Sequence, residues 1–396
     1  MRRVLLIGAS ALLLTVLACS FLLPERYAVN FPLRSLILGS EPPPQSEFAR
    51  RVRVPEGFSI EIFAEGIPNA RFLRFTSAGD LLVSSPRESA IFLLARDADG
   101  DGRADEVRPL LQGLNRPHGM DFRGEWLYVA EMGAIKRVRY DAAQRTTRGE
   151  LETVVADLPR GGGHRTRTLR FGPDGGMYVS VGSSCNVCIE KDARRAAILR
   201  YELDGTGEEL YATGLRNAVG FDWQPETGAL YATDNGRDLL GDDFPPCELN
   251  HVERGGFYGW PFANGDRVPD PEFGSGNVDR VRTSRPPAHG FIAHTAPLGI
   301  TFYRGQAFPP RYRGAAFVAQ HGSWNRTRKS GYRVVLLEWD AASGAFRESD
   351  FALGFELDED VIGRPVDVLD GPDGALYISD DYAGAVYRVA YGGERR

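Results

Sequence analysis

The chain has 396 residues, of which 42% are hydrophobic and 25% are charged, a composition typical of a folded globular protein rather than a disordered one. Its formal net charge is −6 and no basic block is present, which argues against nucleic acid as a partner. The 46 glycines and 25 prolines favour a fold of many short strands and turns over a helical one.

The first segment is an apolar run that follows Arg2-Arg3. Residues 4–23 carry no charge and are long enough to cross a bilayer as a helix. Three interpretations stay open: a signal anchor, a cleaved signal peptide, and a lipoprotein signal that ends at Ala18-Cys19. Each places the rest of the chain in the periplasm or another extracytoplasmic space, and in the signal-anchor interpretation residues 4–23 also hold it to the inner membrane. Residues 1–23 are therefore excluded from the expected fold.

Residues 24–53 are predicted to be a linker, because they show no sustained periodicity and contain the stiff sequence Pro42-Pro43-Pro44. The folded domain is expected over residues 54–392. No long apolar pattern with a period of 3.6 residues occurs in it, so its helix content is predicted to be low.

A strand-like unit recurs along this domain. A turn residue is followed by an apolar strand, often with an aromatic centre, and a second apolar strand lies downstream; the units are about 45–60 residues apart, with one longer interval. The six first strands are Leu81-Leu82-Val83, Leu127-Tyr128-Val129, Met177-Tyr178-Val179, Leu230-Tyr231-Ala232, Ala316-Phe317-Val318 and Leu376-Tyr377-Ile378.

Six such units predict an all-β, six-bladed β-propeller. A strand near Phe58–Phe63 is expected to complete the last blade and close the ring, which would protect the sheet edges. The longer interval contains Gly236–Gly290, rich in Gly, Pro, Asp and Asn, and is interpreted as loops on one face of the propeller.

An acidic loop resembles the start of a calcium-binding loop. Asp97, Asp99, Asp101 and Asp105 occupy positions 1, 3, 5 and 9, with glycines between them. Position 12 is Arg108 rather than the bidentate Glu of an EF-hand. We therefore predict a structural calcium loop; a solvated hairpin tip is the alternative.

The stretch Gly161–Cys188 carries the strongest catalytic signal. Three glycines deliver His164 to the start of a predicted strand, which suits a general base at the mouth of a channel. The alternative is a histidine that only satisfies its loop. Cys185 and Cys188 end the stretch; a small disulfide loop is favoured over a zinc site, which lacks further ligands, and over a thioredoxin-like pair, which lacks a βαβ context.

Polar residues recur just before the strands that would line the central channel. His118, Arg216-Asn217 and Arg364 each stand there, so they are expected to converge at one mouth. Two arginines at one mouth indicate an anionic ligand, since guanidinium groups pair with carboxylates. The alternative is that each is an ordinary surface arginine in a salt bridge.

Two further loops offer chemistry. Asp242-Asp243 lie in a second acidic, proline-containing loop that suits a hard cation such as Ca²⁺, unless it is only a rigid polar loop. The sequence from His321 to Arg326 ends a predicted strand and places Trp324 beside Asn325, an aromatic ring beside a polar group.

Five long segments resemble the glucose/sorbosone dehydrogenases, and most closely their L-sorbosone dehydrogenase-like members. These segments are GGGHRTRTLRFGPDGGMYVSVG, TGLRNAVGFDWQPETGALYATDNGRDLLGDD, PPCELNHVERGGFYGWP, APLGITFYRGQAFPPRYRGAAFVAQHGSWNR and GRPVDVLDGPDGALYISDD. The resemblance covers residues 54–391. It implies a six-bladed propeller that uses pyrroloquinoline quinone (PQQ) and calcium to oxidise an aldose or aldehyde sugar such as sorbosone, and that passes electrons to a quinone or a cytochrome.

The resemblance also implies roles for single residues. His164 would be the general base that takes the proton of the substrate C1 hydroxyl as hydride moves to the quinone. Asp242 and Asp243 fall where the family offers carbonyl oxygens to calcium. The residues that it places at or near the cofactor are His118, Arg216, Asn217, His294, Thr295, Trp324, Asn325 and Arg364.

Two departures from the family pattern weaken this reading. Gly163 stands where soluble glucose dehydrogenases have an aspartate, and the cofactor-binding lysine has no clear counterpart in the HGSWNR segment. Two other functions therefore stay open: a propeller that binds a ligand or partner without catalysis, and a calcium-dependent, lactonase-like hydrolase. The latter would need carboxylate and Asn ligands in the channel, where this chain offers His and Arg.

Overall fold

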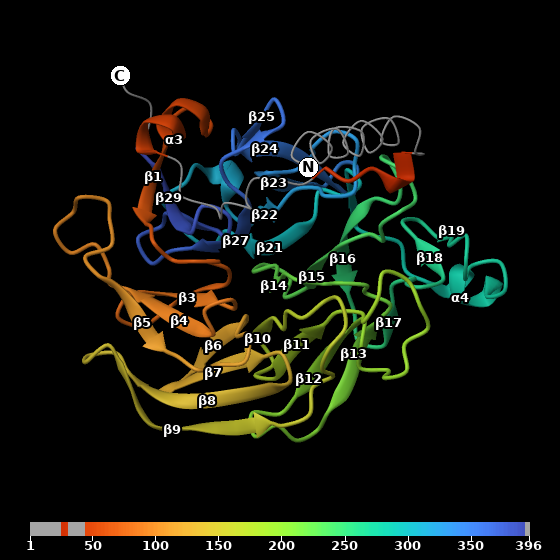
Figure 1. Cartoon of the computed structure of the whole chain (residues 1–396), viewed down its shortest axis with the longest axis horizontal. Coiled ribbons are helices and arrows are strands. Elements are labelled where there is room, and N and C mark those ends of the chain that lie inside the picture. The colour runs from red at the N-terminus through yellow and green to blue at the C-terminus, as the bar shows by residue number, and fades with distance from the viewer. Residues whose placement is uncertain (1–24, 31–43, 393–396) are drawn as a thin grey trace, which may run out of the picture.

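The structure, a computed structural model, describes residues 25–30 and 44–392. Six four-stranded units stand around a central axis, so the predicted all-β, six-bladed propeller is confirmed (Figure 1). The predicted signal or anchor, residues 1–23, lies outside the described residues. No helix in the described part of the chain is long and apolar enough to cross a membrane.

Each blade is an antiparallel sheet whose strands follow one another outward from the axis. The blades are: β2 (Leu73–Phe75), β3 (Leu81–Ser85), β4 (Ala90–Leu94), β5 (Val107–Leu111); β6 (Met120–Arg123), β7 (Trp126–Glu131), β8 (Ala134–Asp141), β9 (Thr146–Val155); β10 (Leu169–Phe171), β11 (Met177–Val181), β12 (Ala197–Tyr201), β13 (Glu209–Thr213); β14 (Phe221–Trp223), β15 (Leu230–Asp234), β16 (Cys247–Val252), β20 (His289–Phe291); β21 (Pro297–Phe302), β22 (Ala316–Gln320), β23 (Arg333–Asp340), β24 (Ala345–Ala352); and β27 (Pro365–Asp370), β28 (Leu376–Asp380), β29 (Ala385–Tyr391), β1 (Phe58–Ala64).

The recurring strand of the sequence is the second strand of every blade. These strands are apolar on both faces because each blade packs against two neighbours; every residue of β3, β11, β22 and β28 is buried. The core clusters accordingly combine adjacent blades, as where Tyr128 of β7 packs with Leu169 and Val179 of the next blade.

The ring is closed by the first strand of the domain, as predicted. β1 pairs antiparallel with β29, and Ile60 lies opposite Val389. The last blade thus contains both ends of the domain, which joins the ring by main-chain hydrogen bonds and leaves no open sheet edge between the first and last blades.

The long segment within the fourth blade contains short elements besides loops. β17 (Gly256–Phe257) adds a parallel pair to β13 of the preceding blade, and β18 (Ala263–Asn264) and β19 (Val268–Pro269) form a small hairpin. The helix α4 (Val278–Thr283) follows. A second small hairpin, β25 (Glu356–Leu357) and β26 (Asp360–Val361), precedes the last blade, and the 3₁₀ turn η2 (Pro310–Tyr312) lies in the fifth.

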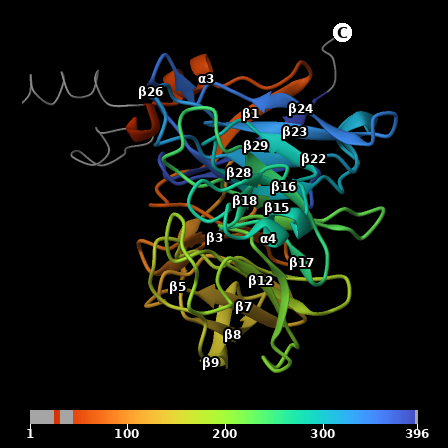
Figure 2. The ribbon, with the colours of Figure 1, turned by 90° about the vertical axis from the view of Figure 1, so that its right-hand side faces the viewer.

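The described parts of the expected linker lie against the propeller. The helix α3 (Gln45–Arg51) buries Phe48, which stacks on Tyr387 with ring centroids 4.6 Å apart. Arg51 pairs with Asp360 at 2.7 Å. The preceding 3₁₀ turn η1 (Glu25–Tyr27) lies on the same side of the propeller as β26, as the red segment shows in profile (Figure 2). Residues 45–53 are therefore packed structure rather than a free tether.

The six innermost strands, β2, β6, β10, β14, β21 and β27, all run in the same direction through the ring. Residues just before these strands therefore meet at one mouth of the channel, and residues at their ends meet at the other. This arrangement decides which side chains can act together.

Candidate functional site

Two adjoining cavities, of about 770 and 310 Å³, open at the mouth where the innermost strands begin. They share lining residues from four blades, so they are two parts of one depression. The shared residues are Arg71, Gly163, Arg165, Thr166, His321 and Arg364.

Seven of the nine residues predicted to be catalytic or cofactor-binding line this depression. They are His118, His164, Arg216, Asn217, His294, Trp324 and Arg364. The convergence that the repeat predicted is therefore present, whereas the chemical role of each residue stays a prediction.

Thr295 and Asn325 do not line either cavity. The hydroxyl of Thr295 donates to the Ile292 carbonyl at 2.9 Å. Asn325 is buried; its Oδ1 accepts from the Leu239 amide at 2.7 Å, and its Nδ2 donates to the carbonyl of Ala28 at 2.6 Å. Asn325 thus joins the N-terminal segment to a loop of the mouth instead of presenting its amide to the cavity.

His164 is held in one tautomer. Its Nδ1 lies 3.0 Å from the carbonyl oxygen of Ser183 and 2.9 Å from the hydroxyl oxygen of the same residue. The carbonyl can only accept, and the Ser183 hydroxyl already donates to the Cys185 carbonyl at 2.7 Å. Both oxygens therefore accept from Nδ1–H, which leaves the lone pair of the imidazole on Nε2.

The surroundings of His164 also keep its ring neutral. Burial lowers the pKa of His164 to about 3, and the positive charge of Arg216 acts in the same direction. A neutral imidazole with a free Nε2 lone pair is the state in which histidine accepts a proton. Ser183 thus orients His164 in a chain that has Gly163, not an aspartate, before the histidine.

Arg216 is bound on all sides by the protein. Its guanidinium pairs with Asp238 at 2.9 Å and donates to the carbonyls of Asn186 and Gly236, each at 2.9 Å. The charge of Arg216 therefore shapes the field of the cavity, while most of its donors are already used. A ligand would have to exchange with Asp238 to gain a bidentate contact.

Arg71 and Arg364 form a second basic pair at the mouth. Arg71 donates to Asp381 at 2.6 Å, while its Nε is buried without a partner among the described residues. Arg364 donates to the carbonyls of His321 and Gly322. Asp381 also pairs with His321 at 2.8 Å, and the positive charges around it hold the pKa of its carboxyl well below the usual range.

Three residues of the site, Arg71, Asp381 and Ser183, were not predicted from the sequence. Arg71 stands just before β2, at the repeat position of His118 and Arg364, so its register could have indicated it. Asp381 and Ser183 follow second strands. Asp381 contacts Arg71 and His321 of the neighbouring blades, whereas Ser183 contacts His164 within its own blade.

The two predicted calcium loops lie in different parts of the propeller, and the aspartates of neither loop line the site-bearing cavities. Asp97, Asp99 and Asp101 bring carboxylate oxygens within 4.8 Å of one another in the loop between β4 and β5, while Asp105 accepts from the Ala98 amide. Asp242 and Asp243 do not line the mouth: Arg326 binds the Asp242 carbonyl and the Asp243 carboxylate, and the Thr327 amide donates to Asp242. Calcium binding at both loops remains a prediction.

Cys185 and Cys188 are joined in a disulfide, which selects the favoured alternative over zinc. The loop that they close touches the site twice. The Cys185 carbonyl holds the Ser183 hydroxyl, and Asn186 Oδ1 accepts from Arg216 at 2.9 Å. The disulfide therefore braces both the residue that orients His164 and the principal charge beside it.

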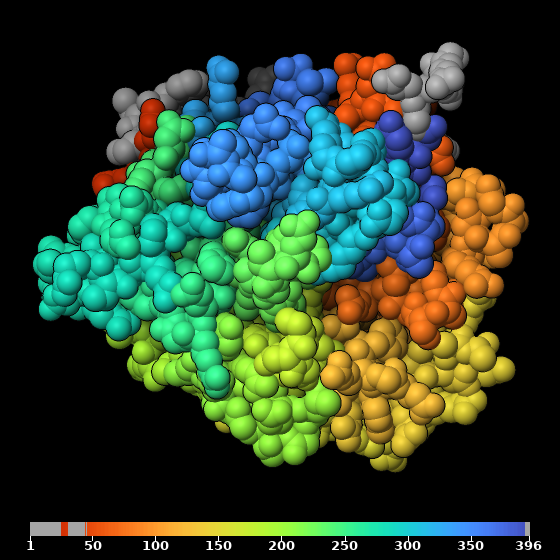
Figure 3. Space-filling view, turned by 180° about the vertical axis from the view of Figure 1, so that it is seen from behind, coloured from red at the N-terminus to blue at the C-terminus, as the bar shows by residue number. Residues whose placement is uncertain are grey.

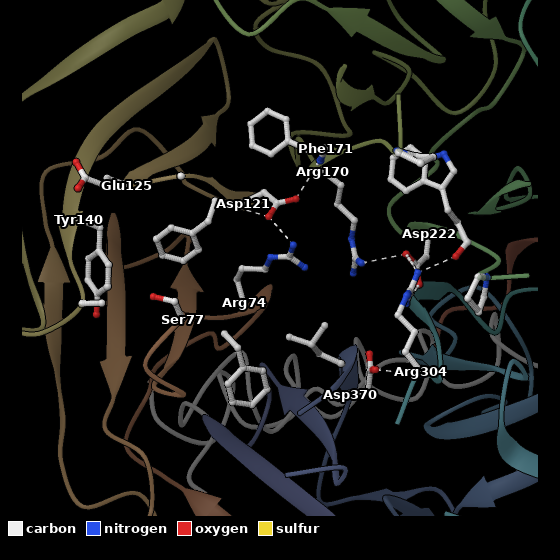
Figure 4. A pocket seen from close by; sticks show the side chains of 18 of the residues that line it. Arg74, Ser77, Asp121, Glu125, Tyr140, Arg170, Phe171, Asp222, Arg304 and Asp370 are labelled. Carbon is white, nitrogen blue, oxygen red and sulfur yellow. Dashed lines mark hydrogen bonds and ion pairs between the residues drawn. The ribbon is translucent and has the colours of Figure 1, made fainter. Parts of the chain in front are cut away.

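The opposite mouth of the channel holds a different cavity, of about 950 Å³. The cavity is lined by loops that follow the innermost strands, and Figure 3 shows this face of the molecule. None of the predicted site residues lines it. Its walls instead carry basic and acidic side chains from successive blades, among them Arg74, Asp121, Arg170 and Asp222 (Figure 4).

These charges join the blades to one another. Asp121 of the second blade pairs with Arg74 of the first at 2.5 Å and accepts from the Phe171 amide of the third at 2.9 Å. Asp222 of the fourth blade accepts from the Phe302 amide and from both terminal nitrogens of Arg304 in the fifth. The charges at this mouth are thus satisfied within the protein and have a structural use.

The sixth blade repeats this pattern. Asp367 accepts from the Leu73 amide of the first blade at 2.9 Å, and Asp370 accepts from the Thr301 hydroxyl and the Arg304 amide of the fifth, each at 3.1 Å. Acidic residues of the even-numbered blades therefore bind donors of both neighbours all around the ring.

The fold agrees with what the chain resembles. The chain belongs to the TrAA12-like family, whose model matches residues 52–247 and 276–392. An uncharacterised protein of Borreliella burgdorferi is 31% identical over 376 residues, which cover 91% of this chain and 95% of that one. The aldose sugar dehydrogenase YliI of Escherichia coli is 23% identical, over 71% of this chain and 76% of its own.

Solved structures share the fold at lower identity. The calcium structure of the Trichoderma reesei carbohydrate-active enzyme of family AA12 has a TM-score of 0.75 and 21% identity, over 86% of this chain and 97% of that one. The holo form of the PQQ domain of pyranose dehydrogenase from Coprinopsis cinerea has a TM-score of 0.72 and 22% identity, again over 86% and 97%. The resemblance to the glucose/sorbosone dehydrogenases is thereby confirmed for family and fold.

Proposed function

We propose that this chain is a PQQ-dependent dehydrogenase that oxidises an aldose or a related aldehyde sugar, with His164 as the general base. The observation that carries the proposal is the neutral His164, fixed through Nδ1–H by Ser183, on the wall of a depression that Arg71, Arg165 and Arg364 also line. Relatives named as aldose sugar dehydrogenase and PQQ-dependent pyranose dehydrogenase support the same chemistry.

The residues present fit a planar, tricarboxylated quinone. Six arginines and two aspartates line the two cavities, so their lining carries a net positive charge. The buried Nε of Arg71 also lacks a hydrogen-bond partner among the described residues. Arg364 and Arg165 line the same space, and the exposed ring of Trp324 lies beside it as a flat apolar surface. Arg71, Arg165 and Arg364 would bind the carboxylates, and Trp324 would contact the ring plane.

When bound, the quinone supplies the acceptor for a hydride from C1 of the sugar. The protein supplies the proton acceptor: Nε2 of His164 takes the C1 hydroxyl proton, and Ser183 then stabilises the imidazolium through Nδ1–H. Arg216 raises the cost of that imidazolium, which favours prompt loss of the proton to solvent. Calcium is the companion ion of the quinone in this proposal, and its predicted binding sites are the loop of Asp97, Asp99 and Asp101 and the loop of Asp242 and Asp243.

The test uses the full chain, cofactor-free and then supplied with PQQ with and without Ca²⁺. Calorimetry should show cofactor binding, and reduction of an artificial dye should depend on an aldose or sorbosone. His164→Gln should lower turnover by about 10³-fold while cofactor affinity stays within about two-fold. His251→Gln, on an exposed histidine of β16, is the matched control. Absence of cofactor binding would reject the proposal in favour of a non-catalytic propeller.

A further inference from the structure

We propose that the rim of the site-bearing mouth rests on the lipid surface, so that the depression opens toward the membrane. The proposal concerns a patch of exposed apolar side chains, Tyr27, Val29, Leu239, Trp324 and Leu357, which we call the rim patch. Their exposed fractions range from 37% for Leu239 to 58% for Val29. The proposal does not depend on the proposed function.

Hydrogen bonds to two asparagines join the segments that carry the rim patch. The Asn30 amide donates to the Trp324 carbonyl at 2.7 Å, and the Asn30 side chain donates to Glu359, in the turn after Leu357, also at 2.7 Å. Asn325 holds the carbonyl of Ala28, between Tyr27 and Val29, and the amide of Leu239. Residues from four separate parts of the chain therefore form one rim.

This rim belongs to the site. Trp324 lines the same cavity as His164 and is 43% exposed. Five of the thirteen large apolar side chains that are exposed in the described part of the chain lie in the rim patch. Trp and Tyr among them are the residues enriched where proteins meet the headgroup region of a bilayer.

The chain outside the described residues indicates what covers the patch. The uncharged apolar run of residues 4–23 ends two residues before Glu25. Two residues span at most about 7 Å even when fully extended, so a membrane segment ending at Leu23 would keep Glu25–Asn30 at the bilayer surface. Since Asn30 and Asn325 tie those residues to the mouth, the mouth must lie there too.

The orientation has a consequence for the electron acceptor. A membrane-dissolved quinone takes up two electrons and two protons, the same number that oxidation of an aldose to a lactone releases. Such an acceptor would reach the depression without leaving the lipid. This consequence, unlike the orientation, rests on the proposed function.

The test measures tryptophan quenching of the full chain in vesicles of phosphatidylcholine and phosphatidylglycerol, with and without acyl-chain bromination. Brominated lipid should lower the emission, and Trp324→Phe should reduce the quenched part by about two-fold or more. Trp339→Phe is the matched control, because this side chain is 55% exposed but far from the mouth. The strand β23 begins near the mouth, where Arg333 lies opposite Gln320, and runs away from it, so that Leu337 lies opposite Ala316 and Trp339 comes still later.

Three results would overturn the orientation: a chain that fails to float with the vesicles, an emission that bromination does not change, or quenching that Trp339→Phe removes and Trp324→Phe does not. Leu357→Glu is a second variant, because it alters one exposed side chain in a surface hairpin and leaves the cavity intact. It should reduce the quenching of Trp324 in the otherwise unchanged chain.

Discussion

At the scale of single residues, the mouth depends on groups whose protonation is displaced by burial. Asp234 accepts from the amides of Arg216 and Asn217, and Glu248 lies opposite it on β16. Burial raises the pKa of Glu248 to about 7, and burial together with Glu248 raises the pKa of Asp234. Two acids that are buried side by side destabilise the folded state when both are ionised, because burial and the like charge both oppose the second ionisation.

Glu248→Gln should therefore stabilise the protein in a pH-dependent way. Because the folded pKa of Glu248 is raised, its favourable contribution is complete below about pH 4.3 and is lost as the pH rises through about 7. The variant should raise the free energy of unfolding by about 1–3 kcal/mol at pH 8 and change it little at pH 5. Its new Nε2 can donate to the buried, unpartnered Oδ1 of Asn250 after that amide turns. Equal effects at both pH values would contradict the assignment.

His164 should stay neutral well below the usual range of histidine. In the cofactor-free protein, its pKa of about 3 predicts that the imidazole remains unprotonated from pH 8 down to pH 5. Since this pKa is lowered, the group costs stability as the pH falls below about 6.5. Nitrogen NMR of the imidazoles measures this directly, and the spectrum of His164→Gln identifies the signal. A midpoint near 6.5 would show that the ring is solvated, contrary to the structure.

At the scale of elements, the disulfide loop links the fold to the site. The double variant Cys185→Ser/Cys188→Ser should lose about 2 kcal/mol of stability, the entropy of a loop of about four residues. It should also lower turnover by about 10-fold, because the Cys185 carbonyl and Asn186 no longer hold Ser183 and Arg216 firmly. Thermal unfolding and dye reduction test both parts. Wild-type protein under reducing agent should behave likewise; unchanged turnover in both samples would refute the positioning role.

Elements also show where sequence reasoning succeeds. The second strands are apolar on both faces, so their pattern survives in every blade and predicted the fold and its closure. Residues 45–53 gave no such signal, because α3 is seven residues long and Phe48 is its main buried anchor. His118, Arg216 and Arg364 were found through their common register. Asp381 acts through contacts with the neighbouring blades and Ser183 through a contact with His164, and no local sequence pattern records either.

At the scale of the whole molecule, the charges at the mouth opposite the site hold the ring together. Asp222→Ala should cost about 3–5 kcal/mol, because it removes the acceptor of the Phe302 amide and leaves the buried Arg170 without its carboxylate partner. The matched control is Glu125→Gln in the exposed pair with Arg139, which should change stability by less than about 1 kcal/mol. Calorimetry measures the free energy of unfolding of both variants. If both lose a similar small amount of stability, Asp222 contributes little to the closure of the ring.

The ion pairs and hydrogen bonds that join neighbouring blades at this mouth also limit how many blades the ring can have. At the innermost strands, odd-numbered blades offer donors, such as Arg74, Arg170 and Arg304, and even-numbered blades offer carboxylates, such as Asp121 and Asp222. Farther from the axis the order is reversed once, where Asp80 of the first blade accepts from Arg145 of the second. A ring built on alternation closes without conflict only when its members are even in number, because one blade added or removed would set two donors or two carboxylates side by side. The chemical repeat of the innermost strands is thus a pair of blades, and a duplication or deletion that preserves these innermost pairs must involve two blades at a time.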